Sequence, residues 1–180
     1  MSERPPNEVN YVTPEVKALI GIEAEMAAWD AVERGTIRRF VQAVMDPDPV
    51  YWDDGEAAGT RFGGVIAPPL FPLYNFRFPP TAPDALMPAL TDALYHGGSF
   101  LPRFGLPDVP GPERRLNGGN EIEFFAAAKP GDRLRARSRI EDIFQKAGRS
   151  GPMVFVRMMI EIRNQEGEIL LINRQTSIRR

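Results

Sequence analysis

The stretch Asp132–Ile140 reads DRLRARSRI, and its strict alternation decides the fold class. Because successive side chains of an extended chain point to opposite faces, this pattern predicts a half-buried β-strand. One face of the strand carries Leu134, Ala136, Ser138 and Ile140, and the other carries Arg133, Arg135, Arg137 and Arg139. We expect the arginine row to be a solvated sheet face that is paired across strands with Glu121 and Glu123.

Similar patterns on both sides of this stretch extend the predicted sheet. The predicted antiparallel meander consists of Asn120–Ala126, Asp132–Ile140, Met153–Arg163 and Glu168–Ile178, with turns at Lys129–Asp132 and Asn164–Gly167. These turns are rich in the residues that reverse a chain. The C-terminal third is therefore predicted to form a sheet, and a sheet of this kind needs a helix to cover its apolar face.

Two helices are predicted before the sheet. Thr13-Pro14 has the composition of a helix start, and Gly21 is expected to end that short helix. A second helix is predicted over Thr36–Met45, with an apolar stripe at Ile37, Phe40, Val41 and Val44, and with Arg38, Arg39 and Gln42 facing away. The fold class is thus α+β.

Prolines are concentrated in the middle of the chain. Of 18 prolines, eleven lie between Pro68 and Pro112. Proline removes a backbone donor and disrupts helix interiors, so we predict a proline-rich loop insertion over residues 77–112, with a short helix near Ala85–Tyr95. A loop of this length usually covers a site or an interface. Residues 1–180 otherwise have the length of a single domain.

Composition excludes several classes of function. The net charge of −2 gives no basic field for nucleic acid. The chain has no cysteine and one histidine, His96, so we expect no disulfide, no metal and no resident cofactor. No apolar run approaches the ~18–20 residues of a membrane helix, and the N-terminus has no signal-peptide pattern. We therefore expect a cytoplasmic protein.

Several fragments, in this order and spacing, carry a family resemblance. They are RGTIRRF (34–40), DPDPVYWD (46–53), RFGGVIAPP (61–69), RLNGGNEIEF (115–124) and KPGD (129–132). Together they resemble the MaoC-like dehydratase family, most closely its N-terminal, FAS1-like dehydratase branch. The resemblance implies a hot-dog fold, in which an antiparallel sheet wraps around a central helix and pairs with a second hot-dog domain. It also implies reversible hydration of 2-enoyl thioesters to 3-hydroxyacyl thioesters.

Asp46 and Tyr51 are the candidate catalytic residues. The reaction needs a group that takes the α-proton, a donor to the leaving hydroxyl, and N–H groups at the thioester oxygen. The resemblance implies the pattern Asp-x-Asn-Pro-x-His for the proton chemistry, whereas this chain reads Asp46-Pro47-Asp48-Pro49-Val50-Tyr51. A phenol with an unperturbed pKa of ~10 is a poor base at neutral pH. Pro69 also lacks an N–H where the family implies a donor to the thioester oxygen.

The candidate substrate-binding residues lie in the same fragments and in the loop. They are Phe62, Gly63, Gly64, Val65, Ile66, Ala67, Phe71, His96, Asn117, Gly118 and Gly119. Structural roles compete with each of these assignments. Asp46 suits an Asx-turn, Tyr51 suits a pocket wall or the core, His96 suits a loop, and Asn117–Gly119 suits a turn or bulge. The arginine row could also meet the phosphates of coenzyme A.

The altered catalytic pattern favours an acyl-CoA-binding subunit of a (3R)-hydroxyacyl-CoA dehydratase or enoyl-CoA hydratase. A hot-dog partner with an intact Asp/His pair would complete it, in a homodimer or heteromer, and coenzyme A would enter only as the thioester substrate. The alternatives are a self-sufficient hydratase that uses Asp46 and Tyr51, and a non-catalytic acyl-thioester binding protein. A thioesterase of the same fold is less favoured, because Pro68-Pro69 suits it badly.

Overall fold

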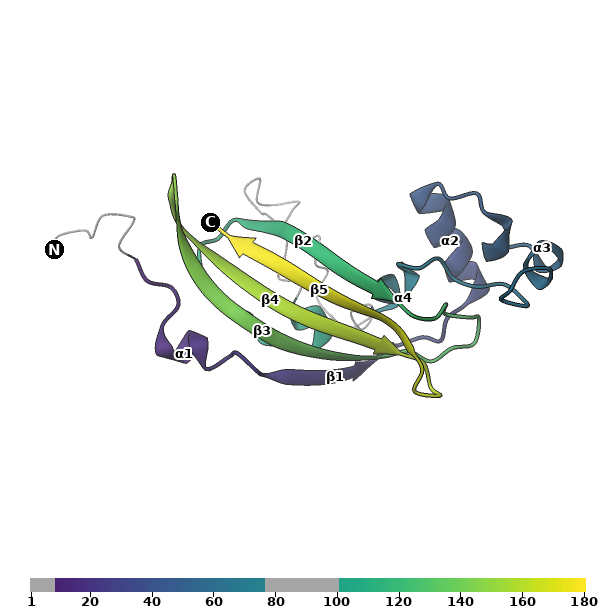
Figure 1. The fold of residues 1–180 in the computed structure, drawn as a ribbon, viewed down its shortest axis with the longest axis horizontal. Coiled ribbons are helices and arrows are strands. Elements are labelled where there is room, and N and C mark those ends of the chain that lie inside the picture. The colour runs from purple at the N-terminus through teal and green to yellow at the C-terminus, as the bar shows by residue number, and fades with distance from the viewer. Residues whose placement is uncertain (1–8, 77–100) are drawn as a thin grey trace.

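The dominant feature of the computed structural model, which describes residues 9–76 and 101–180, is a curved antiparallel sheet (Figure 1). Its five strands lie in the order β1-β3-β4-β5-β2. They are β1 (Glu23–Ala27), β2 (Arg115–Phe124), β3 (Arg135–Gly148), β4 (Gly151–Arg163) and β5 (Ile169–Arg179). The observed architecture is α+β, as predicted.

The alternation of the DRLRARSRI stretch is realised in β3. Leu134, Ala136, Ser138 and Ile140 are buried, and Arg133, Arg135, Arg137 and Arg139 are exposed. The register against β4 shifts between Ile140 and Asp142, which marks a β-bulge. A bulge bends its strand and increases the local twist, so it adds to the curvature of the sheet.

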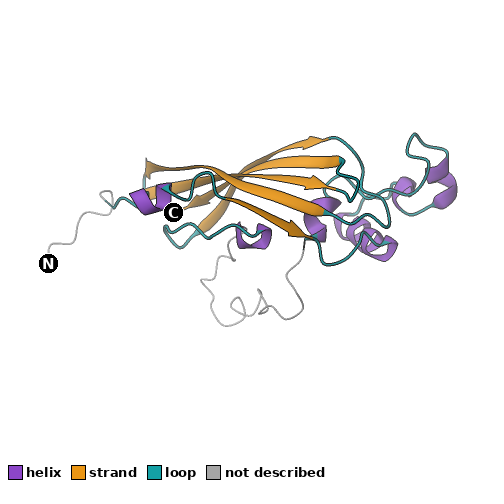
Figure 2. Cartoon of the chain, turned by 90° about the horizontal axis from the view of Figure 1, so that it is seen from below, coloured by secondary structure: helices purple, strands orange, loops and turns teal. Residues whose placement is uncertain are grey.

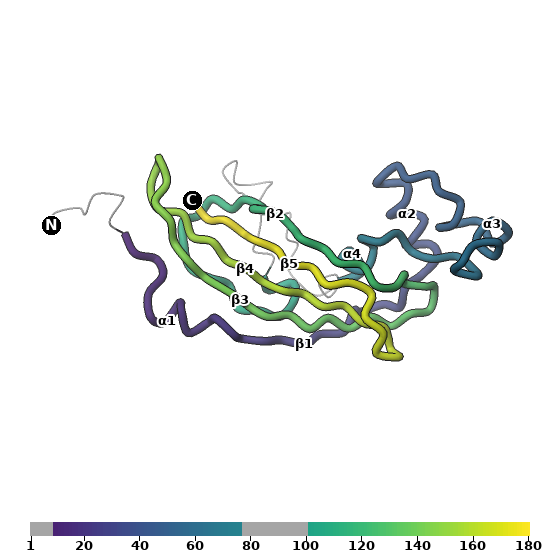
Figure 3. Tube along the Cα trace, in the orientation of Figure 1, coloured from purple at the N-terminus to yellow at the C-terminus, as the bar shows by residue number. Residues whose placement is uncertain are grey.

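The helices fall into two groups, apart from the first one, α1 (Pro14–Lys17), which lies at the other end of the sheet from α2 (Arg34–Val44) (Figure 1). The others are the 3₁₀-helix η1 (Pro49–Tyr51), α3 (Asp54–Ala58), α4 (Phe71–Asn75) and the 3₁₀-helix η2 (Leu101–Phe104). The group of α2, η1 and α3 lies beyond one end of the sheet, as the chain trace shows (Figure 3). The other group, α4 and η2, packs on the buried face of the sheet, where the ring centroids of Phe76 and Phe104 lie 5.5 Å apart (Figure 2).

The first helix, α1, agrees with its sequence signal at its start but not at its end. The Thr13 hydroxyl accepts from Val16 N–H at 3.4 Å, as expected of an N-cap. The helix nevertheless ends at Lys17, before Gly21, whose φ is +90°. The N–H of Gly21 instead donates to the Ile140 carbonyl at 2.8 Å. Gly21 therefore serves the junction with β3 rather than a helix cap.

The first strand was not predicted, and it changes the partner of the arginine row. Glu23 on β1 pairs with Arg137 at 2.7 Å and with Arg139 at 3.8 Å. The predicted pairing of this row with Glu121 and Glu123 is wrong, because their strand β2 lies at the opposite edge of the sheet. Glu123 pairs with Arg174 of β5 instead.

Part of the proline-rich segment is described. The predicted helix Ala85–Tyr95 lies outside the described residues. Within residues 101–112, the apolar side chains of Leu101, Phe104, Leu106 and Val109 are buried in the core. The Ser138 hydroxyl donates to the Phe104 carbonyl oxygen at 2.7 Å, which fixes η2 against β3.

Candidate functional site

The chain reverses direction immediately after α2. Met45 adopts a left-handed conformation with φ 56°, and the N–H of Asp46 donates to the Val41 carbonyl at 3.1 Å. Such a turn satisfies the last carbonyls of a helix, and glycine usually occupies it. Here the turn places Asp46 at the C-terminal end of α2, at the start of the segment that returns along the helix.

The short helix η1 then directs Tyr51 back toward α2. Pro49 occupies its first turn, and the Asp48 carboxylate accepts from Val50 N–H at 3.0 Å. Val50 itself is buried in a small cluster with Val65 and Ile66. This cluster anchors η1, so the neighbouring Tyr51 is held in a defined direction.

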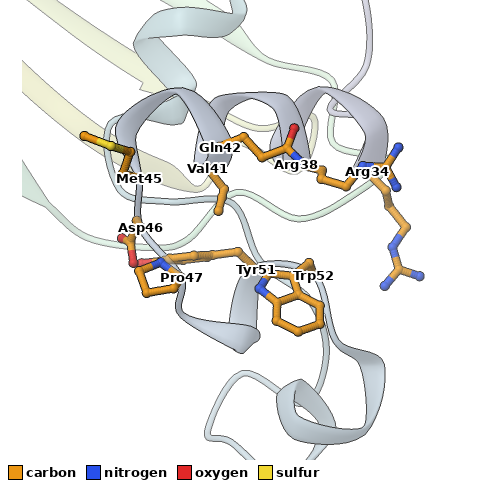
Figure 4. Close-up of a pocket in the computed structure, with 9 residues that line it drawn as sticks. All are labelled: Arg34, Arg38, Val41, Gln42, Met45, Asp46, Pro47, Tyr51 and Trp52. Carbon is orange, nitrogen blue, oxygen red and sulfur yellow. The ribbon is translucent and has the colours of Figure 1, made fainter.

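A pocket of about 600 Å³ lies between α2 and η1 (Figure 4). Its lining residues are Arg34, Arg38, Val41, Gln42, Met45, Asp46, Pro47, Tyr51 and Trp52. The ring of Tyr51 points toward Asp46 and Pro47, whereas Arg34 lies at the opposite end (Figure 4). The structure therefore brings the two candidate catalytic residues together at one end of a single pocket.

Asp46 has a structural contact as well as a place in the pocket. Its Oδ1 accepts from Asp48 N–H at 3.3 Å, which is the Asx-turn geometry that its sequence context favours. The residue is half-buried. A structural role for Asp46 and a role in the pocket are thus compatible.

Burial raises the pKa of the Tyr51 phenol, and the carboxylates of Asp46 and Asp48 raise it further. Burial disfavours the charged phenolate, and nearby negative charges repel it. Tyr51 therefore keeps its proton at neutral pH. It can donate a hydrogen bond to an oxygen atom in the pocket, but it cannot serve as a base there.

None of the predicted substrate-binding residues of the RFGGVIAPP segment lines this pocket. Val65, Ile66 and Ala67 are buried, and the N–H of Ala67 donates to the Ala128 carbonyl at 2.8 Å. Phe62 is half-buried, with the Arg61 guanidinium 4.7 Å from its ring centroid. A substrate-binding role for these residues stays a prediction.

The remaining predicted residues are spread over the fold. Phe71 is completely buried in the core and meets Phe40 edge-on, with the ring centroids 5.7 Å apart. At the bulge of β2, a side chain on Gly118 would approach Ile178 Cγ1 to 2.9 Å, so close packing alone explains that glycine. Gly63 and Gly64 have no atom within 4 Å of an added Cβ. His96 lies outside the described residues.

Sequence reasoning named only Asp46 and Tyr51 as site residues among those that line the pocket, and it missed the other seven: Arg34, Arg38, Val41, Gln42, Met45, Pro47 and Trp52. Arg38 and Gln42 were expected to face away from the core, and they do, but the surface they face is the pocket. The available signal was the spacing of Arg34, Arg38 and Gln42, which are each four residues apart and so lie on one helical face. Nothing in the sequence indicated that η1 would cover that face.

Within residues 9–76 and 101–180, no cluster of three or more histidine, cysteine or acidic side chains could hold a metal ion. No helix in the same part of the chain is long and apolar enough to cross a membrane.

Known proteins that resemble this chain in fold and in sequence show which class of protein it belongs to. The Mycobacterium tuberculosis ChsH1–ChsH2 complex is similar in fold, with a TM-score of 0.62 at 20% identity, over 92% of this chain and 86% of that chain. Residues 18–172 match the model of the FAS1-like, dehydratase domain region. Fold and sequence family together define a hot-dog protein of the hydratase/dehydratase class. The chain belongs to this FAS1-like dehydratase family, which confirms the resemblance to MaoC-like dehydratases.

Two curated relatives are similar in sequence. The mesaconyl-C(4)-CoA hydratase of Chloroflexus aurantiacus is 34% identical over 111 residues, which are 61% of this chain and 36% of that enzyme. A UPF0336 protein of Saccharopolyspora erythraea is 28% identical over 164 residues, which are 91% of this chain and 90% of that protein. The chain thus spans little more than a third of the Chloroflexus enzyme.

Proposed function

We propose that this chain is the acyl-CoA-binding subunit of a (3R)-hydroxyacyl-CoA dehydratase or enoyl-CoA hydratase, and that a hot-dog partner completes its active site. The observation that carries the proposal is that Asp46 and the protonated phenol of Tyr51 line the same end of one pocket. Tyr51 occupies the position where the family pattern implies a histidine, and its pKa is raised. A pocket of this kind can bind and orient a thioester, but none of its lining residues in the described part of the chain is a histidine that could move the proton.

The proline pair at the start of α4 supports a binding role. Pro69 has no N–H to offer a thioester oxygen. The N–H of Phe71 already donates to the Pro68 carbonyl at 2.9 Å, so it is not free for that purpose. Loss of one donor to the developing oxyanion typically lowers a rate by about 10²–10³.

The free edge of β2 supports the assembly with a partner. β2 pairs with β5 on one side, and no strand of the described residues pairs with its other side. Phe124 and Phe125, where this strand ends, are 51% and 56% exposed. A sheet edge that carries exposed aromatic rings is suited to pair with another chain. The ChsH1–ChsH2 complex, which has the same fold, consists of two different chains.

The decisive experiment is crotonyl-CoA hydration. The purified chain is assayed alone and after mixing with a hot-dog protein that holds an intact Asp/His pair, and loss of the enoyl-thioester absorbance is followed. We expect negligible turnover alone and substantial turnover in the mixture. Butyryl-CoA, which cannot be hydrated, measures binding separately by calorimetry.

Two outcomes would replace the proposal with one of its alternatives. Substantial turnover by the chain alone that is abolished by Asp46→Asn would establish a self-sufficient hydratase. Butyryl-CoA binding without turnover in any mixture would establish a non-catalytic binding protein. Absence of thioester binding would leave a structural role.

A further inference from the structure

The pocket has a basic end that the hydration chemistry does not use. Arg34 and Arg38 lie one helical turn apart on the face of α2 that lines the pocket, and Gln42 continues the same row. Asp46 and Tyr51 occupy the opposite end (Figure 4). The pocket is therefore polarised along α2, with its guanidinium groups away from the place where the reacting carbon would lie.

Of the described acidic residues around the pocket, Asp54 offsets the charge of Arg34, whereas the others hydrogen-bond within their own turns and form no ion pair with Arg38. Asp54 pairs with Arg34 at 2.5 Å. The carboxylate of Asp53 accepts from the N–H of Gly55 at 2.9 Å and so caps α3. Asp46 and Asp48 accept from backbone N–H groups in their own turns.

Arg38 is the basic group that remains available. In residues 9–76 and 101–180 it makes no hydrogen bond or ion pair, and its side chain is exposed at the pocket. The neighbouring Arg39 differs, because its Nη2 donates to the Thr36 hydroxyl at 3.2 Å and it does not line the pocket. The chain thus contains a matched pair of adjacent arginines, of which one faces the pocket.

We propose that Arg38, assisted by Arg34, binds an anionic group of the thioester that enters the pocket, which rests on the proposed function. A guanidinium presents a fork of N–H donors that matches phosphate and carboxylate oxygens. Arg38 lies six residues before Val44, the last residue of α2, which corresponds to about 9 Å of helical rise between Arg38 and the end of the helix where Asp46 follows. The separation suits a ligand whose charge is remote from its thioester carbon.

Two parts of a thioester could supply that anion. One is the phosphates of coenzyme A, and the other is a free carboxylate at the far end of the acyl chain. Both would reach Arg38 along the wall formed by Val41, Met45 and Trp52, whose indole is 51% exposed. Removing the phosphates from the ligand separates the two sources.

The test measures binding to the full chain by isothermal titration calorimetry. Three probes are used: butyryl-CoA, butyryl-pantetheine, which has no phosphate, and adipyl-pantetheine, which has a carboxylate only. The variants are Arg38→Gln and its control Arg39→Gln, which remove the same charge from adjacent positions of α2. We expect Arg38→Gln to weaken an anionic probe about five- to tenfold, between the effects of an exposed ion pair and of a charged hydrogen bond.

The outcomes separate the sources and the hypotheses. Weaker butyryl-CoA binding by Arg38→Gln with unchanged butyryl-pantetheine binding supports phosphate recognition, whereas weaker adipyl-pantetheine binding supports carboxylate recognition. In either case, added salt should reduce wild-type affinity more than that of Arg38→Gln. Unchanged affinities, or an equal loss in Arg39→Gln, overturn the inference but leave the proposed function intact. If the wild-type chain binds none of the probes, the proposed function itself fails.

Discussion

If the proposed function holds, replacing Tyr51 with histidine should raise the hydratase activity of the isolated chain. The substitution Tyr51→His supplies the imidazole that the family pattern implies, five residues after Asp46. The Asp46 carboxylate near Tyr51 would stabilise the imidazolium, whereas burial would oppose it, so the two effects keep the group titratable near neutral pH. The ring position and the pocket are otherwise retained.

The size of the gain follows from what is restored and what stays missing. A positioned general acid–base group contributes about 10²–10⁴ to a rate. Pro69 still withholds a donor from the oxyanion, so we expect the lower end, a rise of about 10² over the wild-type chain. The half-buried Tyr51 packs against both apolar clusters, and its loss should reduce the free energy of unfolding by about 1 kcal/mol.

The assay is crotonyl-CoA hydration by the purified variant without a partner, with butyryl-CoA affinity measured in parallel. Tyr51→Phe is the control, because it keeps the ring and offers no titratable group. Suppose that Tyr51→His binds butyryl-CoA as tightly as the wild-type chain but hydrates crotonyl-CoA no faster than Tyr51→Phe. The phenol would then not be the reason for low hydratase activity at this pocket. The partner-subunit argument from Tyr51 would then be refuted.

Three further predictions concern charge, stability and assembly. Burial and nearby carboxylates raise the pKa of Tyr51, so its contribution to the free energy of unfolding is present below pH ~10 and is lost as the pH rises above it. Because Asp46→Asn removes one of these carboxylates, it should shift the ultraviolet titration of the Tyr51 phenol to lower pH. Asp108 pairs with Arg179, which is 5% exposed. Asp108→Ala should therefore lower the free energy of unfolding, measured in urea, by about 1–2 kcal/mol. The loss is smaller than for a fully buried ion pair, because Asp108 is partly exposed. Phe124→Asp at the free edge of β2 should weaken self-association or partner binding at least about tenfold in sedimentation experiments, since it places a charge in an aromatic contact.

Each of these predictions has a control and a contradicting result. Subtracting the titration of Tyr51→Phe isolates the phenol, and an unmoved titration in Asp46→Asn would show that the two groups do not interact. Glu113→Ala removes an exposed carboxylate from the same loop as Asp108 and should leave the urea midpoint unchanged. Trp29→Asp replaces another exposed aromatic ring in the same way. An equal loss of association in that variant would show that the effect of Phe124→Asp is not specific to the edge of β2.

Local patterns explain which elements were foreseen. The alternation of residues 132–140 requires only that neighbouring side chains take opposite faces, and the burial of β3 follows it residue by residue. The Thr13 cap likewise depends on an interaction within its own helical turn. By contrast, Glu23–Ala27 is a strand because β3 supplies its hydrogen-bond partners, and its acidic composition carries little strand propensity of its own.

The sequence by itself predicted an antiparallel sheet with helices, and its family resemblance implied that a phenol and a proline nitrogen without a hydrogen stand where other members carry two catalytic groups. Those facts are local, because they depend on side-chain chemistry and on contacts within a few residues. Only the tertiary structure decided that the ring of Tyr51 points toward Asp46 and that Arg38 lines the same pocket. That arrangement depends on the left-handed turn at Met45, which redirects the chain after α2, and on the apolar cluster that anchors η1. In this cluster, Val50 packs against Val65 and Ile66 from a later segment, and such packing is not encoded by local propensity.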